Sequence, residues 1–319
     1  MIHYLISNNT PMIAALGLLF AFAGTCFFLT KCSDYLPKDG GREFAHDGKL
    51  SKGKPRGAGL IFILVFTVAT LLFAPLSREI VIYLILVAAE MLTGYMDDAS
   101  EHPWGEYKKG LLDLIVAIVL AVTFLNYNSS TIEIATLGIS VDILPIVFGI
   151  LTVILVWASI NVTNCADGVD GLSGTLAMIT LMSIYLVGNI KGLDGEFPYL
   201  ILVFVICILG YLWYNATPSR LMMGDAGSRA MGIFISIAVL KTGSPLLYIP
   251  LAIVLILDGG LGLLKVFLLR FCKIHILKNI RTPLHDQVRK NMGWSNTQTV
   301  FRFAIIQIVV AVATIYMLL

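Results

Sequence analysis

The chain has 319 residues, of which 58% are hydrophobic and 13% are charged. Soluble domains carry about 25% charged residues, so length and composition exclude an ordinary soluble protein and indicate an integral membrane protein. The net charge is only +2, and the five cysteines are odd in number without a CxxC spacing, which argues against a disulfide framework or a zinc site. No long polar stretch could form a second domain, so residues 1–319 are expected to be one integral-membrane domain with no nucleic-acid partner.

Stretches apolar enough to cross a bilayer, which takes about 20 residues, occur ten times. They predict an all-α bundle of about ten transmembrane helices. The first stretch lacks a preceding basic region and is long enough to span, so we expect a retained helix and not a cleaved signal. The predicted spans lie near residues 10–31, 57–75, 80–96, 110–126, 143–160, 172–190, 197–214, 229–241, 247–271 and 300–319.

The placement of positive charge predicts the orientation of these spans. Of the 22 Lys and Arg residues, eighteen fall in the segments after odd-numbered spans, three fall in the other loops (Arg78, Lys191 and Lys241), and Lys265 lies within a span. Because cytoplasmic loops carry the excess of Lys and Arg, the odd loops are predicted to be cytoplasmic and both termini to face outward.

The candidate functional residues all fall on that predicted cytoplasmic face. Such segregation is typical of a metal-dependent enzyme that acts on phosphates. In chain order they are Asp97 and Asp98 at the end of span 3, Asp167 and Asp170 after span 5, Asp225 after span 7, and His285 after span 9.

Asp97 and Asp98 are adjacent carboxylates where an apolar helix meets water. Two neighbouring carboxylates repel one another and cost desolvation free energy. Mg²⁺ would compensate, since it is commonly held by one or two carboxylates together with substrate phosphates. The alternative is a pair of solvated acids that marks the membrane boundary.

The segment 161–172 contains two Asp-Gly dipeptides, which favour tight turns. It leads into the sixth span, and the free N–H groups of a helix N-terminus can receive a phosphate. Its Asn and Asp side chains could read sugar hydroxyls or a nucleobase edge. For Asp170 or Ser173, a simple helix cap is the alternative.

Two later segments repeat this theme. Asp225 lies between Gly224 and Gly227, which let a backbone approach a ligand closely. His285, in the basic segment before the last span, could donate to a phosphate or carry a proton.

Together these motifs resemble those of the polyprenyl-phosphate N-acetylhexosamine-1-phosphate transferases. The resemblance covers essentially the whole chain, and its four ordered motifs are highly specific. They are Asp97-Asp98; the NxxNxxDGxDGL pattern from Asn161 to Leu172; Trp213-Tyr214-Asn215 followed by Met223 to Ser228; and Pro283-Leu284-His285 followed by Gly293-Trp294-Ser295.

The resemblance implies a reaction and roles for residues. A Mg²⁺-dependent enzyme of the bacterial cytoplasmic membrane would transfer phospho-MurNAc-pentapeptide from UDP-MurNAc-pentapeptide to undecaprenyl phosphate, giving lipid I and UMP for peptidoglycan. Asp97 would be the acid–base or phosphate-activating residue, Asp98 would support it, Asp225 and Asp167 would bind the metal, and His285 would complete the centre. The implied substrate-binding residues are Lys52, Lys109, Asn164, Asp167, Gly168, Asp170, Asn215 and Met222.

Several alternatives stay open. Sibling enzymes that use UDP-GlcNAc share the Asp-Asp and GDxGS elements, and a transporter would place charges such as Asp113, Asp258 and Lys265 along an ion path. Asp258 and Lys265 are two helical turns apart and are expected to pair loosely. Direct attack by the lipid phosphate is favoured over a covalent intermediate on Asp225, because that phosphate is already a nucleophile. The sequence does not decide whether the chain forms a homodimer.

The chain departs from the usual family pattern at four places, one of which is Met222, where an aromatic residue is usual before the MGD block. Asp286 and Gln287 stand where two further histidines are usual, and a TPTMGG stretch is replaced by Lys54 to Gly59. Asp258 occupies a position that is usually small and uncharged.

Overall fold

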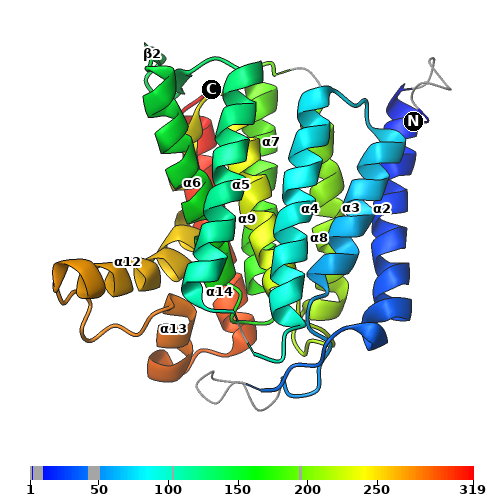
Figure 1. Ribbon diagram of the computed structural model, residues 1–319, viewed down its shortest axis with the longest axis vertical. Helices are drawn as coiled ribbons and strands as arrows, with labels where there is room; N and C mark the ends of the chain where they lie inside the picture. Colours follow the sequence, from blue (N-terminus) through cyan, green and yellow to red (C-terminus); the bar gives the residue numbers. More distant parts are fainter. Residues whose placement is uncertain (1, 3–9, 42–50, 103, 194–195) are drawn as a thin grey trace.

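The structure is a computed structural model that describes residues 2, 10–41, 51–102, 104–193 and 196–319. Lys49 and Arg42, two of the cations counted above, lie outside these residues. The described chain is a bundle of long helices in which the start of α2 and the end of α14 lie at the same end (Figure 1). The long helices are α2 (Thr10–Cys32), α3 (Gly59–Phe73), α4 (Arg78–Asp98), α5 (Glu106–Tyr127), α6 (Pro145–Cys165), α7 (Leu172–Ile190), α8 (Phe197–Asn215), α9 (Gly224–Lys241) and α14 (Asn296–Tyr316).

Each of the ten predicted stretches is largely helical in the structure. Within the described residues, seven helices are long and apolar enough to cross a membrane, and a bent pair raises the number to eight. The helix α3 is apolar but shorter, with 15 residues. The predicted eighth span begins earlier than expected, because α9 starts at Gly224 and includes Asp225 in its first turn.

The helix α9 forms the centre of the bundle, since every residue from Gly224 to Leu240 is buried. Its neighbours approach it closely through glycines. A Cβ atom added to Gly94 of α4 would lie 2.4 Å from the Asp225 carbonyl oxygen, and one added to Gly232 of α9 would lie 2.6 Å from the Ile160 Cα atom. Small residues permit such backbone contacts between membrane helices. The position of α9 therefore depends on these glycines.

The predicted ninth span is not one straight helix. The segments Pro245–Leu251 and Ile253–Cys272 meet at an angle of 72°. The second segment contains a π-helical turn, η3 (Ile256–Gly260), which holds Asp258 and Gly259 buried against α6. From there α12 (Leu261–Phe267) projects sideways from the bundle (Figure 1). A π turn re-aims a helix locally, and hydropathy alone did not indicate it.

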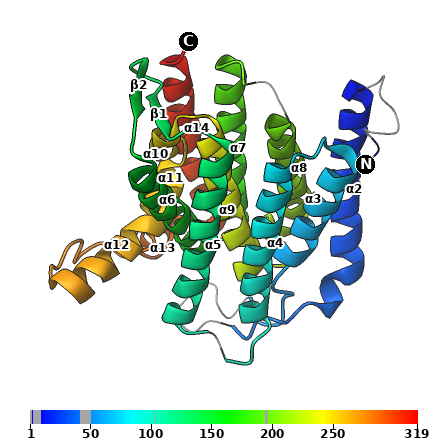
Figure 2. The same cartoon turned by 45° about the horizontal axis from the view of Figure 1, so that its top comes forward.

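Two polar connections have structure of their own. A hairpin of β1 (Thr131–Ile134) and β2 (Ile139–Asp142) pairs antiparallel, with Thr131 opposite Asp142 (Figure 2). The all-α prediction is therefore wrong for this hairpin, whose apolar and polar residues alternate. His285 was expected in a loop but lies in the short helix α13 (Leu284–Met292).

Candidate active site

The end of the bundle away from the termini gathers the predicted site residues. There α4, α6 and α8 end while α5, α7 and α9 begin, and α13 lies beside them (Figure 1). Asp97, Asp225 and His285 lie in these elements and are buried. Motifs up to about 190 residues apart in sequence therefore converge in one region.

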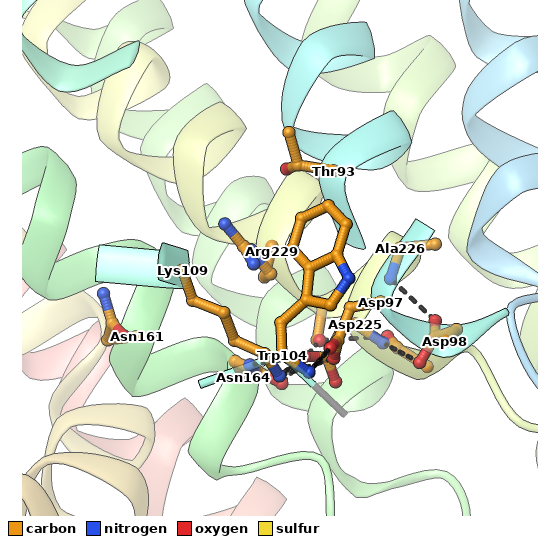
Figure 3. A network of polar contacts seen from close by, with 12 residues as sticks. Thr93, Asp97, Asp98, Trp104, Lys109, Asn161, Asn164, Asp225, Ala226 and Arg229 are labelled. Carbon is orange, nitrogen blue, oxygen red and sulfur yellow. Dashed lines mark hydrogen bonds and ion pairs between the residues drawn. The ribbon is translucent and has the colours of Figure 1, made fainter. Parts of the chain in front are cut away.

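At its centre Lys109 bridges two carboxylates (Figure 3). Its Nζ atom lies 2.5 Å from Asp97 Oδ2 and 2.9 Å from Asp225 Oδ2. Asp97 Oδ1 also accepts the Trp104 backbone N–H at 2.6 Å. Lys109 begins α5 while Asp97 ends α4 and Asp225 begins α9, so three helices fix this arrangement. The structure thus brings together three of the predicted residues.

Asp98 has a different role from its neighbour. Its two carboxylate oxygens accept the backbone N–H groups of Asp225 and Ala226, each at 3.1 Å (Figure 3). The first N–H groups of a helix lack partners within the helix, and a carboxylate there also interacts favourably with the helix dipole. Asp98 therefore caps α9 from α4 and fixes where Asp225 lies.

Arg56 adds a second cation that was noted in the sequence only as a departure. Its Nε atom lies 2.9 Å from Asp98 Oδ1, and its terminal nitrogens lie 3.5 Å from Asp225 Oδ1 and 3.8 Å from Asp39 Oδ1. Burial alone would lower the pKa of Arg56, but the surrounding carboxylates outweigh it and raise that pKa. Arg56 stays charged and holds the loop before α3 against the carboxylates.

The segment 161–172 is positioned by contacts to α8 and α9. Asn164 donates to Asp225 Oδ2 at 3.5 Å and accepts from the Ser228 hydroxyl at 3.0 Å. Asp167 accepts from the Ser173 hydroxyl at 2.6 Å. Gly171, with φ of 82°, is the N-cap of α7, so the capping alternative for Asp170 and Ser173 is wrong.

Asn215 and Asp170 hold the segments 167–171 and 215–221 together. Asn215 accepts the Gly171 N–H at 2.7 Å and donates to the Leu221 carbonyl at 2.8 Å. Asp170 accepts the Ser219 N–H at 3.2 Å. Both hydrogen bonds of Asn215 are internal to the protein, which shows a positioning role for its buried side chain.

His285 is oriented by the buried Asp258. Asp258 accepts the His285 backbone N–H at 2.7 Å and lies 2.9 Å from the ring Nδ1. The other ring nitrogen faces Gly168, where an added Cβ atom would lie 2.2 Å from Nε2. The expected pairing of Asp258 with Lys265 is wrong: the π turn directs Asp258 to α13, and Lys265 donates to the Leu277 and Ile280 carbonyls.

Next to His285, Asp286 forms ion pairs with two cations of α13. It lies 2.8 Å from Lys290 Nζ and 3.1 Å from Arg289 Nη2. Burial would raise the pKa of Asp286, but the Lys290 hydrogen bond and the nearby positive charges lower it overall. Asp286 is therefore ionised and stabilises α13.

Two of the predicted substrate-binding residues, Lys52 and Met222, have less direct connections to the Asp97–Lys109–Asp225 centre. Lys52 is exposed in a turn, and no contact between described residues joins its side chain to Asp97 or Asp225. Met222 takes part through its backbone, which donates to the Pro55 carbonyl at 2.8 Å and accepts the Ala58 N–H at 3.0 Å. All five cysteines are free.

Sequence comparison identifies the family. The model of glycosyl transferase family 4 matches residues 80–243, which include α4 from its third residue and all of α5 through α9. A phospho-N-acetylmuramoyl-pentapeptide-transferase of Treponema pallidum is 38% identical over 94% of this chain and 88% of its own length. Proteins of the same name from Symbiobacterium thermophilum and from Wolbachia are 30% and 26% identical, over 79% and 84% of this chain and 78% and 85% of their own lengths. This chain therefore belongs to glycosyl transferase family 4, in the group formed by the phospho-N-acetylmuramoyl-pentapeptide transferases.

Proposed function

We propose that this protein transfers phospho-MurNAc-pentapeptide from UDP-MurNAc-pentapeptide to undecaprenyl phosphate, releasing UMP and forming lipid I. The observation that carries the proposal is the contact of Lys109 with Asp97 and Asp225, supported by the caps and loops around it. The Lys109 cation between two carboxylates suits a phosphate-transfer reaction, because a fixed positive charge can stabilise the negative charge of phosphates that bind and react there.

The bundle supports an orientation in a bacterial cytoplasmic membrane. The exposed surface of helices such as α2 and α6 is rich in large apolar side chains, which suits contact with lipid. We propose ten crossings, with both termini outside and the Asp97–Asp225 end in the cytoplasm, as the distribution of Lys and Arg favours. A nucleotide-sugar made in the cytoplasm would then reach the site directly.

Mg²⁺ is proposed as the cofactor, with Asp225 and Asp167 as ligands. No group of three His, Cys, Asp or Glu side chains in the described chain is arranged as a metal cage. Mg²⁺ does not need one, since it takes one or two carboxylates, water and substrate phosphates. At the centre, four buried carboxylates face two cationic side chains, which leaves a formal charge of −2 for a divalent cation to balance. The donor set therefore fits; the four acids are Asp39, Asp97, Asp98 and Asp225, and the cations are Arg56 and Lys109.

In the proposed reaction an oxygen of undecaprenyl phosphate attacks the phosphorus that bears the sugar. A new P–O bond forms, the bond to the UMP phosphate breaks, and UMP leaves with the electron pair. The bound cation would supply charge neutralisation. Lys109 is the more accessible cation at the centre, with 26% of its side chain exposed, and would contact the pyrophosphate. Asp97, held by Lys109 and the Trp104 amide, would accept a proton from the incoming phosphate when that phosphate is monoprotonated.

The remaining residues orient the reactants. Arg56, kept charged by its carboxylate neighbours, would offset the charge of the second phosphate. His285 Nε2 lies against Gly168 and, when the ring held through Nδ1 by Asp258 is protonated, would donate to an oxygen of the nucleotide-sugar beside the 167–171 segment. Because the nucleophile is supplied by the lipid, these residues need only align the groups and screen their charge.

The test offers purified protein the two nucleotide-sugars separately, with undecaprenyl phosphate, and measures UMP release. Release from UDP-MurNAc-pentapeptide but not from UDP-GlcNAc is the expected result. Release from UDP-GlcNAc alone would assign the chain to the sibling reaction. No release from either, with folded protein and Mg²⁺ present, would contradict the transferase proposal.

A further inference from the structure

A second layer of charged side chains lies deeper in the bundle than the proposed site. The guanidinium of Arg229 is 1% exposed and contacts two buried carboxylates, with Glu90 Oε2 at 3.1 Å and Asp113 Oδ1 in close contact. Asn161 donates to the other oxygen of Asp113 at 3.1 Å, and Figure 3 shows Asn161 and Arg229 beside the centre. This lower layer, defined as Glu90, Asp113, Arg229 and Asn161, is not part of the chemistry proposed above.

The lower layer uses the same four helices as the site. Helix α9 carries Arg229 one turn after Asp225, and α5 carries Asp113 one turn after Lys109. Residues four apart lie on one face of a helix, so each helix presents both members of its pair to the same neighbours.

The other two helices repeat this pattern. Helix α4 carries Glu90 two turns before Asp97, and α6 carries Asn161 three residues before Asn164. Every helix that supplies a group to the Asp97–Lys109–Asp225 centre thus also supplies one to the lower layer.

On two of the four helices, α9 and α5, the sign of the charge alternates between the layers. On α9 the Asp225 carboxylate lies one turn nearer the helix start than the Arg229 cation, and on α5 the Lys109 cation lies one turn nearer the helix start than the Asp113 carboxylate. A one-turn slip of α9 past α5 would place Asp225 at the level of Asp113 and move Arg229 away from it. Like charges in contact inside the bundle are strongly unfavourable, so the lower layer specifies one register.

Stability alone explains this layer poorly. Taking three ions out of water costs several kcal/mol for each ion, and apolar replacements are often as stable. The orphaned Glu90 Oε1 and Arg229 Nη1 atoms, which have no hydrogen-bond partner among the described residues, add to that cost. A role in fixing geometry is the better account of its presence.

We propose that Arg229, held between Glu90 and Asp113, is a positioning residue that sets the register of α9 against α4 and α5. This register in turn fixes Asp225 and Lys109 where they would contact the cation and the pyrophosphate. The inference rests on the proposed function, because that function places Asp225 and Lys109 in the reaction. Arg229 itself touches no reactant. Its fork matters as well as its charge, since a guanidinium can hold two carboxylates in fixed directions whereas an ammonium cannot.

The test uses Arg229→Lys and the apolar triple variant Glu90→Leu, Asp113→Leu, Arg229→Met. For the triple variant we expect a thermal unfolding midpoint close to that of the wild type. Its kcat should be lower by about 100-fold, because a misplacement of reacting groups by about 1 Å has an effect of that size. Its binding of Mn²⁺, measured directly by electron paramagnetic resonance, should be weaker. For Arg229→Lys, which keeps the charge, we expect kcat lower by about tenfold.

The matched control is Glu79→Gln with Lys241→Gln. That pair, 3.0 Å apart, joins the same helices α4 and α9 at the opposite end, so its loss should leave kcat and Mn²⁺ binding unchanged. Wild-type kcat and Mn²⁺ binding in both test variants would overturn the inference. Should the triple variant fail to fold, wild-type kcat in Arg229→Lys alone overturns it. The variant Asp225→Asn distinguishes the two proposals. Full activity in this variant would contradict the proposed site. An inactive Asp225→Asn variant together with normal lower-layer variants would contradict only the role of Arg229.

Discussion

Gly94 offers the most direct test of the packing that places Asp225. The change Gly94→Ala adds one methyl group at the point where α4 meets the first turn of α9. The nearest atoms would be the Asp225 carbonyl oxygen at 2.4 Å, the Asp225 carbonyl carbon at 2.5 Å and the Ala226 nitrogen at 2.6 Å. All three belong to the backbone, so no side-chain rotation can make room.

The size of the effect follows from these distances. Ordinary contact begins at 3.4 Å, so α4 and α9 must separate by about 1 Å. The same displacement lengthens the two 3.1 Å hydrogen bonds by which Asp98 caps α9. A 1 Å displacement of reacting groups costs about 100-fold in rate, or about 2.7 kcal/mol of transition-state stabilisation. Overpacking should cost about 1–3 kcal/mol of unfolding free energy as well.

The assay compares kcat/KM for UMP release with the thermal unfolding midpoint in the same detergent. Gly110→Ala is the matched control, because Gly110 follows Lys109 in α5 and an added Cβ atom there meets nothing within 4 Å. We expect Gly110→Ala to behave as the wild type. Activity of Gly94→Ala within a few-fold of this control would refute the argument that close packing of α4 on α9 fixes Asp225.

Four further outcomes are expected. Asp225→Asn keeps the side-chain size but removes the charge opposite Lys109, so UMP release should fall by at least about 100-fold while the protein still folds; wild-type rates would remove Asp225 from the site. Excess chelator should stop turnover and added Mg²⁺ or Mn²⁺ restore it, and full turnover in chelator would count against the metal. Asp258→Asn should lower kcat about tenfold by weakening the hold on His285, with unchanged kcat as the contrary result. The lowered pKa of Asp286 means that its stabilisation is complete above the ordinary value of 3.8 and is lost as pH falls through the lower folded value. Asp286→Asn should therefore flatten the loss of stability below about pH 4, and identical acid-unfolding curves would contradict this.

Local sequence determined the helices and most of the centre. Long apolar stretches have few ways to satisfy their backbone in a bilayer other than as helices, so ten of them could be located by composition alone. Adjacent acids at a helix end and Asp-Gly turns are local signals, and through them Asp97, Asp167 and Asp225 were found. The family resemblance then supplied the reaction and Lys109.

Only the tertiary structure decided which charges meet. Arg229, Glu90 and Asp113 are up to 139 residues apart, and in the sequence they are isolated charges within or beside apolar spans. Their pairing depends on the relative register of α4, α5 and α9, which glycines such as Gly94 permit. Asp258 contacts His285 and not Lys265 because the π turn Ile256–Gly260 that holds Asp258 directs its carboxylate to α13. Hydropathy records that a segment is apolar, but the direction of each buried charge is set by the helices packed around it.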